Sequence, residues 1–362
     1  MNRDELLTLA RTVLTLPTAP YHEHRVQAFV VGFCRKLSHV RVEQDRVGNV
    51  IVKYRRRRAG ASAPLVFVAH MDHPGFEMLG GNRAEFLGGV PKEMFAKGQG
   101  VRVYSANGVQ RARVSRFDAS AWPKRKLVEL QADGPLRKGD FGMWDVPAFR
   151  LSGGKLRATA IDDVLGTAVM LATLAEVSRR KVRAHMWCAF TRAEEVGFPG
   201  VMALIQSKRI PRNALVVSIE MSKERPWARI GNGPIVRVGD RSTMFDPLAT
   251  AFLLRAADRC CKGESAFRVQ RCLMDGGTCE ATAFVGFGYR AGGLCLPLGN
   301  YHNIGKNLRP RAEYVSVNDL EQLVALTVAA AVGSPVSGAT NGLLRQQVLS
   351  ILRTAPRKLK RI

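Results

Sequence analysis

The sequence predicts an α/β fold, with a mixed sheet between layers of helices and a small all-β domain inserted into it. Short apolar runs alternate with helical patterns, which is typical of buried strands in such a sheet. Residues 74–154 differ, because they are rich in glycine and short β-like segments and contain no convincing helix. The 362 residues suffice for one large domain that carries a second one.

The first part of the chain supplies helices and then strands. Residues 3–37 have apolar positions at helical spacing, interrupted near Pro17, and residues 40–55 change to a strand pattern. The apolar run at 64–69 predicts a buried strand that ends at His70.

The α/β pattern resumes after the insert. A long apolar helix follows Asp162, and Asn318 with Glu321 three residues on resembles a capping box that begins a helix through about Val332. Three further buried strands are predicted, at 185–191, 214–219 and 294–298.

We therefore expect three parts in the chain. Residues 1–73 and 155–340 would form the discontinuous main α/β domain, and residues 74–154 the inserted β domain. Residues 341–362 would form a basic C-terminal helix and tail.

Composition narrows the class of protein. No apolar run is long enough to span a bilayer, and the N-terminus lacks an apolar signal core, so we expect no membrane association. Seven cysteines without a CxxC pair argue against a disulfide framework and favour the reducing cytoplasm. The net charge of +25 would attract anions, but no zinc-finger or RNA-binding motif accompanies it. We expect a solvated basic surface without a specific nucleic-acid site.

Candidate metal ligands follow the buried strands. In chain order they are His70, the pair Glu194-Glu195, Glu220 and His302, with Asp162 at the start of a helix as a further candidate. Ligands in open α/β sheets bind beyond the carboxyl ends of the strands, so we expect these side chains to converge. Imidazoles and carboxylates are ligands for zinc or a similar divalent ion.

Each motif alone has a plainer interpretation. A histidine after a strand is most often a satisfied core or surface residue, the pair Asp162-Asp163 could cap the next helix, and a Glu-Glu pair is usually solvated. Glu220 fits less easily, because an unpaired carboxylate in an apolar run is costly. The common order of all these residues is what favours a metal site.

Four segments in this order resemble a known family. They are Ala69-His-Met-Asp-His-Pro-Gly-Phe76, Ala160-Ile-Asp-Asp-Val-Leu-Gly166, Glu194-Glu-Val-Gly-Phe-Pro-Gly200 and Tyr301-His302. They are similar to motifs of the tetrahedral aminopeptidases, the glutamyl and deblocking aminopeptidases of the dinuclear metallopeptidase clan. Weaker similarity at Val47–Val50 and Gly231–Pro234 extends the resemblance over most of the chain.

The resemblance implies a mixed-sheet α/β/α metallopeptidase domain that binds two divalent metal ions, zinc or alternatively cobalt or manganese. His70 and Glu220 would hold one ion, Glu195 and His302 the other, and Asp162 would bridge both. The inserted domain would join subunits into a homo-oligomer, a dimer or a larger assembly up to a dodecamer.

The resemblance also implies catalytic roles. Glu194 would be the general base that activates a metal-bridging water, and Asp72 would orient His70. The peptide bond between Asp162 and Asp163 would be cis. Two ions about 3.5–4 Å apart can polarise the scissile carbonyl, and a carboxylate beside the attacking water can move its proton to the leaving amine.

The sequence departs from the family pattern at several positions. Glu220 stands where the family has Asp, and Cys279-Glu280 follows Gly-Gly-Thr where the family has Asp, which puts substrate contacts in doubt. Glu313 lies eleven residues after His302, whereas the family has a Glu close by, so a loop is inserted there. Asp163 is followed by Val164, where the family often has Arg.

Three functions remain in competition. The first is a dinuclear metallo-aminopeptidase acting on peptides. The interval of 92 residues between His70 and Asp162 (162 − 70) holds the insert and favours this layout. The second is an amidohydrolase or deacylase of small N-acyl substrates, whose relatives insert their extra domain later in the chain. The third is a non-catalytic binding protein with a basic surface, which elemental analysis for metal would separate from the other two.

Overall fold

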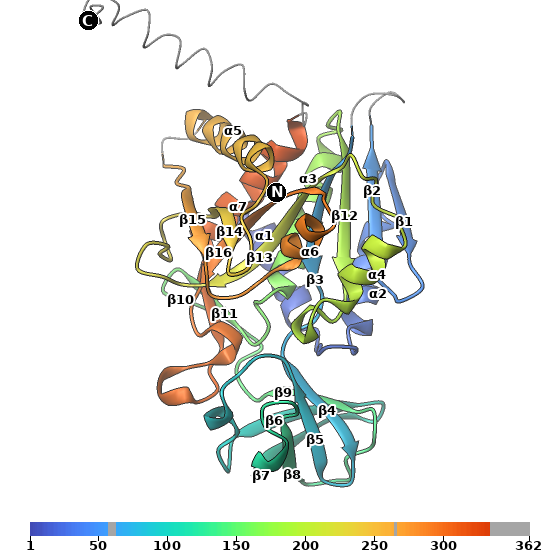
Figure 1. The fold of residues 1–362 in the computed structure, drawn as a ribbon, viewed down its shortest axis with the longest axis vertical. Coiled ribbons are helices and arrows are strands. Elements are labelled where there is room, and N and C mark those ends of the chain that lie inside the picture. The colour runs from blue at the N-terminus through green and yellow to red at the C-terminus, as the bar shows by residue number, and fades with distance from the viewer. Residues whose placement is uncertain (57–62, 264–265, 334–362) are drawn as a thin grey trace, which may run out of the picture.

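The structure, a computed structural model, describes residues 1–56, 63–263 and 266–333. A main α/β domain stands above a smaller β-barrel (Figure 1). The expected C-terminal helix and tail, 341–362, lies outside the described residues.

An eight-stranded mixed sheet forms the centre of the main domain. The adjacent strands β12, β3, β13 and β16 are parallel, while β2 and β14 pair with them antiparallel. The strand β3 is buried along its whole length, which explains its unbroken apolar run. In spatial order the strands are β1 (Val40–Gln44), β2 (Val50–Arg55), β12 (His185–Thr191), β3 (Leu65–His70), β13 (Leu215–Lys223), β16 (Arg290–Leu298), β14 (Ile235–Asp240) and β15 (Gln270–Met274).

Helices cover both faces of this sheet and complete a three-layer α/β/α arrangement (Figure 1). Alternate residues of β3 point to opposite faces, so Leu65 packs in one core and Val66 in the other. One face is covered by α1 (Arg3–Leu14), α2 (His24–Cys34), α3 (Val164–Arg179), α5 (Pro247–Gly263) and α7 (Val317–Val332), and the other by α4 (Pro199–Gln206) and α6 (Glu280–Gly286). No helix within the described ranges has the length and apolar character needed to cross a bilayer.

The insert is a closed six-stranded barrel with its own core. Aromatic rings fill this core, and Phe76 meets both Phe86 and Trp144 edge to face. Around the barrel the strands are β4 (Gly75–Gly80), β5 (Arg83–Leu87), β8 (Leu127–Ala132), β7 (Gly108–Asp118), β6 (Gly100–Ser105) and β9 (Phe141–Trp144).

A small three-stranded sheet connects the two bodies. It contains β10 (Phe149–Ser152), β11 (Lys155–Ala158) and β17 (Glu313–Ser316). The expected boundary between residues 154 and 155 falls inside the β10–β11 hairpin, because β10 pairs with β11 and not with a barrel strand. Pairing of β17 with β11 brings Glu313 opposite Ala158, close to Asp162 in the chain.

The predicted fold class, a mixed-sheet α/β/α domain with an inserted β domain, is confirmed. Two local predictions are wrong. The N-cap of α7 is Ser316, whose side chain accepts from the Asp319 amide, so Asn318 lies inside the helix. The strand expected to end at Glu220 continues to Lys223, because its later residues still pair with β16.

Candidate metal centre

His70 is the last residue of β3, and its ring is held from behind by Asp72. Its Nδ1 lies 3.1 Å from the backbone oxygen of Asp72 and 3.4 Å from that residue's carboxylate. A carbonyl oxygen only accepts hydrogen bonds, so Nδ1 carries a proton, and Nε2 is the nitrogen that would bind a cation. Nε2 faces carboxylate oxygens of Asp162, Glu194 and Glu220 at 3.7, 3.9 and 3.7 Å.

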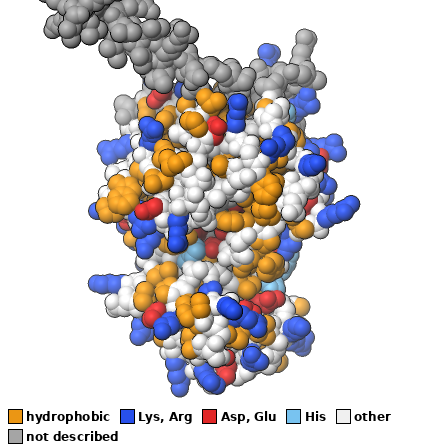
Figure 2. Space-filling model, viewed as in Figure 1, with side chains coloured by type: hydrophobic (Ala, Val, Ile, Leu, Met, Phe, Trp, Pro, Cys, Tyr) orange, Lys and Arg blue, Asp and Glu red, His pale blue; other side chains and the backbone are white. Residues whose placement is uncertain are grey.

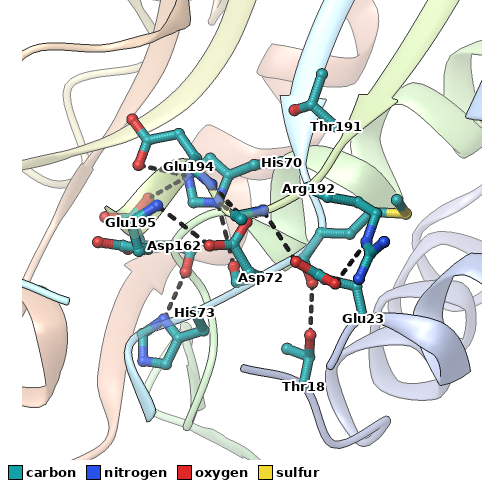
Figure 3. A network of polar contacts seen from close by, with 12 residues as sticks. Thr18, Glu23, His70, Asp72, His73, Asp162, Thr191, Arg192, Glu194 and Glu195 are labelled. Atoms are coloured by element: carbon teal, nitrogen blue, oxygen red, sulfur yellow. Dashed lines mark hydrogen bonds and ion pairs between the residues drawn. The ribbon is translucent and has the colours of Figure 1, made fainter. Parts of the chain in front are cut away.

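The pair Glu194-Glu195 lies in a tight turn after β12, next to Asp72 (Figure 3). The Asp72 carboxylate accepts hydrogen bonds from both glutamate amides, at 3.0 and 3.1 Å. Asp72 therefore contacts His70 and also holds the glutamate turn, so one buried carboxylate positions two of the expected site segments.

An ion pair between a buried glutamate and a partly exposed arginine supports this turn from the other side. Glu23 is fully buried and accepts from Arg192 Nε at 2.7 Å and from the Ala193 amide at 2.9 Å (Figure 3). Gly200 is required because a Cβ there would lie 2.1 Å from the backbone oxygen of Arg192. These contacts explain why the glutamates are followed by a glycine-containing turn.

Asp162 lies between the two halves of the site. The peptide bond from Asp162 to Asp163 is cis, as the resemblance implies. Glu313 accepts from the amides of Ile161 and Asp162 at 2.8 and 3.0 Å. Asp163 stands at the N-cap of α3, but its side chain makes no capping hydrogen bond, so the interpretation of this pair as a simple helix cap does not hold.

His302 comes from the turn after β16 and contacts the inserted barrel. Its Nδ1 donates to the backbone oxygen of Gly89 at 2.7 Å, and its amide donates to Glu313 at 2.8 Å. Its Nε2 lies 3.3 Å from Glu195 and 3.6 Å from Asp162. The inserted barrel therefore takes part in positioning the site, because the loop after β5 reaches one of the histidines.

The five expected ligands meet in two groups that share one carboxylate. Among the described residues, the donor atoms of each group lie within 4.8 Å of one another, the groups being His70, Asp162 and Glu220, and Asp162, Glu195 and His302. A third group of the same kind joins His70 to Glu194 and Glu195. The histidine–carboxylate distances of 3.3–3.9 Å are long for hydrogen bonds but leave room for a cation between the donors.

The electrostatics of the site also fit a metal. Burial raises the pKa of Asp162 and of Glu194 well above the usual range. Burial lowers the pKa of His70 and His302, but neighbouring carboxylates raise it to well above its usual value. Glu194 has this effect on His70, and Glu195 has it on His302. A divalent cation would displace these protons and stabilise the buried carboxylates. Asp162 Oδ1 is buried without a hydrogen-bond partner in the described part of the chain, which is consistent with a ligand atom.

The remaining wall of the pocket contains residues for which the sequence predicted no role. Tyr301, Arg237 and residues 276–278 line it. Cys279 and Glu280 are buried behind the wall, where Glu280 accepts from the hydroxyl of Thr191. Tyr301 stands beside a motif histidine, which was the one available signal, whereas Arg237 belongs to no recognisable pattern.

His73 and Glu23 were also missed. His73 contacts the backbone oxygen of Asp162 and lies 2.9 Å from the side-chain oxygen of Asn303 (the first contact appears in Figure 3). His73 follows Asp72 in a quoted motif, but Glu23 is far from the motifs in sequence, so only the fold reveals it.

Together, the α/β/α scaffold, the inserted barrel and the paired donor groups define a metal-dependent hydrolase. The family model of M42 glutamyl aminopeptidases matches residues 48–326. The chain belongs to this family and is accordingly a peptide-bond hydrolase. No curated protein sequence shows a significant match to it.

Solved structures share the fold. An aminopeptidase from the archaeon Desulfurococcus kamchatkensis is 22% identical, with a TM-score of 0.74 over 92% of this chain and 96% of its own. The TET1 peptidase of Pyrococcus horikoshii is 20% identical, with a TM-score of 0.72 over 90% and 99%. The TET aminopeptidase of a marine sediment thaumarchaeote is 18% identical, with a TM-score of 0.73 over 91% and 96%.

Proposed function

We propose that this chain is a dinuclear metal-dependent aminopeptidase that removes the first residue from peptides with a free amino terminus. The observation that carries the proposal is the pair of donor groups sharing Asp162, with Glu194 beside them in one pocket. His70, Asp162 and Glu220 would hold one ion, and Asp162, Glu195 and His302 the other. Zinc suits these donors, and cobalt or manganese are alternatives.

When bound, the two ions would polarise the scissile carbonyl and lower the pKa of water. Glu194 would accept the proton of the attacking water and pass it to the leaving amine. Asp72 would keep the His70 ring and the glutamate turn in place through its contacts with both. The Gly89 carbonyl would fix the His302 tautomer so that Nε2 faces the ion.

The test of the reaction class compares Leu-Gly-Gly with its N-acetyl form, using metal-reconstituted protein. The carboxylates of the pocket favour a cationic ammonium group over a neutral acyl cap, so the free peptide should be cleaved much faster. Equal or faster cleavage of the acetylated peptide would favour the deacylase alternative. The absence of tightly bound metal by elemental analysis would favour the binding protein.

We further propose a preference for acidic N-terminal residues, supported by Arg237. Its side chain is 2% exposed, lines the pocket and has Nε and Nη1 without partners among the described residues. An unpaired buried guanidinium is costly, and a substrate carboxylate would pair with it. Glutamyl and glutaminyl p-nitroanilides form a matched pair of substrates, and Arg237→Gln should abolish the preference for the first. An equal loss of activity toward both substrates would instead indicate that Arg237 balances the negative charge of the carboxylates in the site.

We also propose that the chain forms a homo-oligomer in the cytoplasm, at least a dimer, through the barrel of residues 74–154. The TET1 peptidase assembles into a tetrahedron or a larger octahedral shell. All seven cysteines are free, which suits a reducing compartment. Lys and Arg side chains are scattered over the visible surface, which gives no sign of a nucleic-acid site (Figure 2). A monomer by light scattering at micromolar concentration would contradict the oligomer.

A further inference from the structure

The turn that carries His302 holds its neighbour Tyr301 in a fixed position. Asn300, His302 and Asn303 all have positive φ angles, of 55°, 54° and 61°. Non-glycine residues in this conformation cost energy and are concentrated at functional sites. The Asn300 side chain donates to the Ala312 backbone oxygen at 2.8 Å, and the Asn303 side chain donates to the Thr159 backbone oxygen at 2.8 Å. The surrounding structure therefore imposes the turn.

The Tyr301 ring stacks on the His302 imidazole, with centroids 3.8 Å apart and an interplanar angle of 21°. The phenol therefore lies directly beside one of the expected metal ligands. Its hydroxyl lies 3.7 Å from the place a Cβ on Gly277 would take, and both residues line the same pocket. No described residue forms a hydrogen bond with this hydroxyl. A phenol O–H that lines a polar pocket without a protein partner is available to a substrate.

We infer that Tyr301 is a further catalytic residue, whose hydroxyl donates a hydrogen bond to the substrate carbonyl oxygen as that oxygen becomes negatively charged. The inference rests on the proposed peptidase function. When water attacks, a C–O bond forms and the carbonyl π electrons move to the oxygen, where the phenol O–H stabilises them. The phenol keeps its proton throughout. The electrons return when the C–N bond breaks and the amine leaves with the proton delivered by Glu194.

The position of the ring and the chemistry of the hydroxyl can be separated experimentally. Tyr301→Phe keeps the stacked ring and removes only the hydroxyl. The control is Tyr314→Phe in β17, whose ring lies near Lys155 and does not line the pocket. Both variants are prepared as full chains and reconstituted with zinc, and their metal content, kcat and KM for Leu-Gly-Gly are measured.

Loss of one donor to a developing oxyanion typically lowers kcat by about 10²–10³. We expect this loss for Tyr301→Phe, with KM and metal content unchanged, and no loss for Tyr314→Phe. A kcat within about threefold of wild type, or a parallel loss of metal, would overturn the inference and leave Tyr301 as a support for His302.

A second measurement separates this inference from the proposed function. The phosphonic acid analogue of leucine resembles the tetrahedral state, whereas leucine itself does not. Tyr301→Phe should bind the phosphonate at least tenfold more weakly by calorimetry and bind leucine as well as wild type does. Equal weakening for both ligands, or for neither, would overturn the role of Tyr301. If wild type binds the phosphonate but cleaves no peptide, the proposed function fails while this measurement still decides the role of the hydroxyl.

Discussion

Replacement of Asp72 by asparagine tests how far a residue behind the donor atoms determines metal binding. The Asp72 side chain is fully buried, accepts from the amides of Glu194 and Glu195, and lies 3.4 Å from His70 Nδ1. Asparagine has nearly the same shape but keeps only one acceptor oxygen. Its NH2 group must then face the backbone amide of either Glu194 or Glu195 and leave that donor unpaired.

The size of the effect follows from the lost contact. A hydrogen bond to a charged group contributes about 1.5–3 kcal/mol, and leaving its buried partner unsatisfied costs about as much as the bond contributes. Every 1.4 kcal/mol corresponds to a factor of ten in an equilibrium constant. If the lost hydrogen bond displaces the segments that carry His70 and Glu195, metal affinity should fall about 10- to 100-fold. We therefore expect Asp72→Asn to reach wild-type turnover, if at all, only at much higher metal concentration.

Competition with a chromogenic chelator gives the metal dissociation constant, and kcat is measured at saturating zinc. Asp319→Asn is a matched control, because Asp319 also accepts from two backbone amides, those of Gly231 and Gly233, at 2.6 and 3.0 Å. This control should lose stability but keep wild-type metal affinity. Unchanged metal affinity in Asp72→Asn, or an equal loss in Asp319→Asn, would refute the reasoning.

Three further predictions test separate parts of the structure. Glu194→Gln should keep its bound metal and lose about 10²–10⁴ in kcat, because a proton acceptor is removed; loss of metal by elemental analysis would instead make Glu194 a ligand. Gly88→Ala should weaken metal binding through His302. A Cβ at Gly88, where φ is +123°, would lie 2.7 Å from Pro74 Cβ and would displace the loop whose Gly89 carbonyl holds His302. The control is Gly98→Ala, because Gly98 also has a positive φ, of +88°, but no atom lies within 4 Å of an added Cβ. Gly98→Ala should not weaken metal binding, and an equal loss of metal affinity in both variants would contradict this explanation. For Glu176, burial is outweighed by hydrogen bonds from the N-terminal amine and an adjacent arginine, which lower its pKa from 4.5 to about 2. A carboxyl group whose pKa is lower in the folded protein than in the unfolded chain stabilises the fold at pH values above the unfolded pKa, and this contribution is lost as pH falls through the folded pKa. Glu176→Gln should therefore lower the free energy of unfolding by at most about 3 kcal/mol at pH 6 and by little at pH 2. An equal difference between the urea midpoints of wild type and Glu176→Gln at pH 6 and pH 2 would disprove this explanation.

Much of the fold and of the donor set could be predicted from local sequence. Runs such as residues 64–69 are apolar because both faces of a central strand are buried, so they identify the strands without any tertiary information. A parallel sheet collects the carboxyl ends of its strands at one edge. The order of His70, Glu194 and His302 after such strands was therefore enough to predict that they converge.

The contacts that support these donors depended on the tertiary structure. Gly89 holds His302 across 213 residues, and Glu23 holds the turn at Arg192 across 169, so no local pattern could indicate them. Glu313 contacts Asp162 despite the inserted loop, because β17 pairs with β11. The sequence determines which side chains are available as ligands through local burial and residue type. Their orientation is decided only by the fold, because it depends on backbone groups that carry no sequence signature and meet only when distant segments pack together.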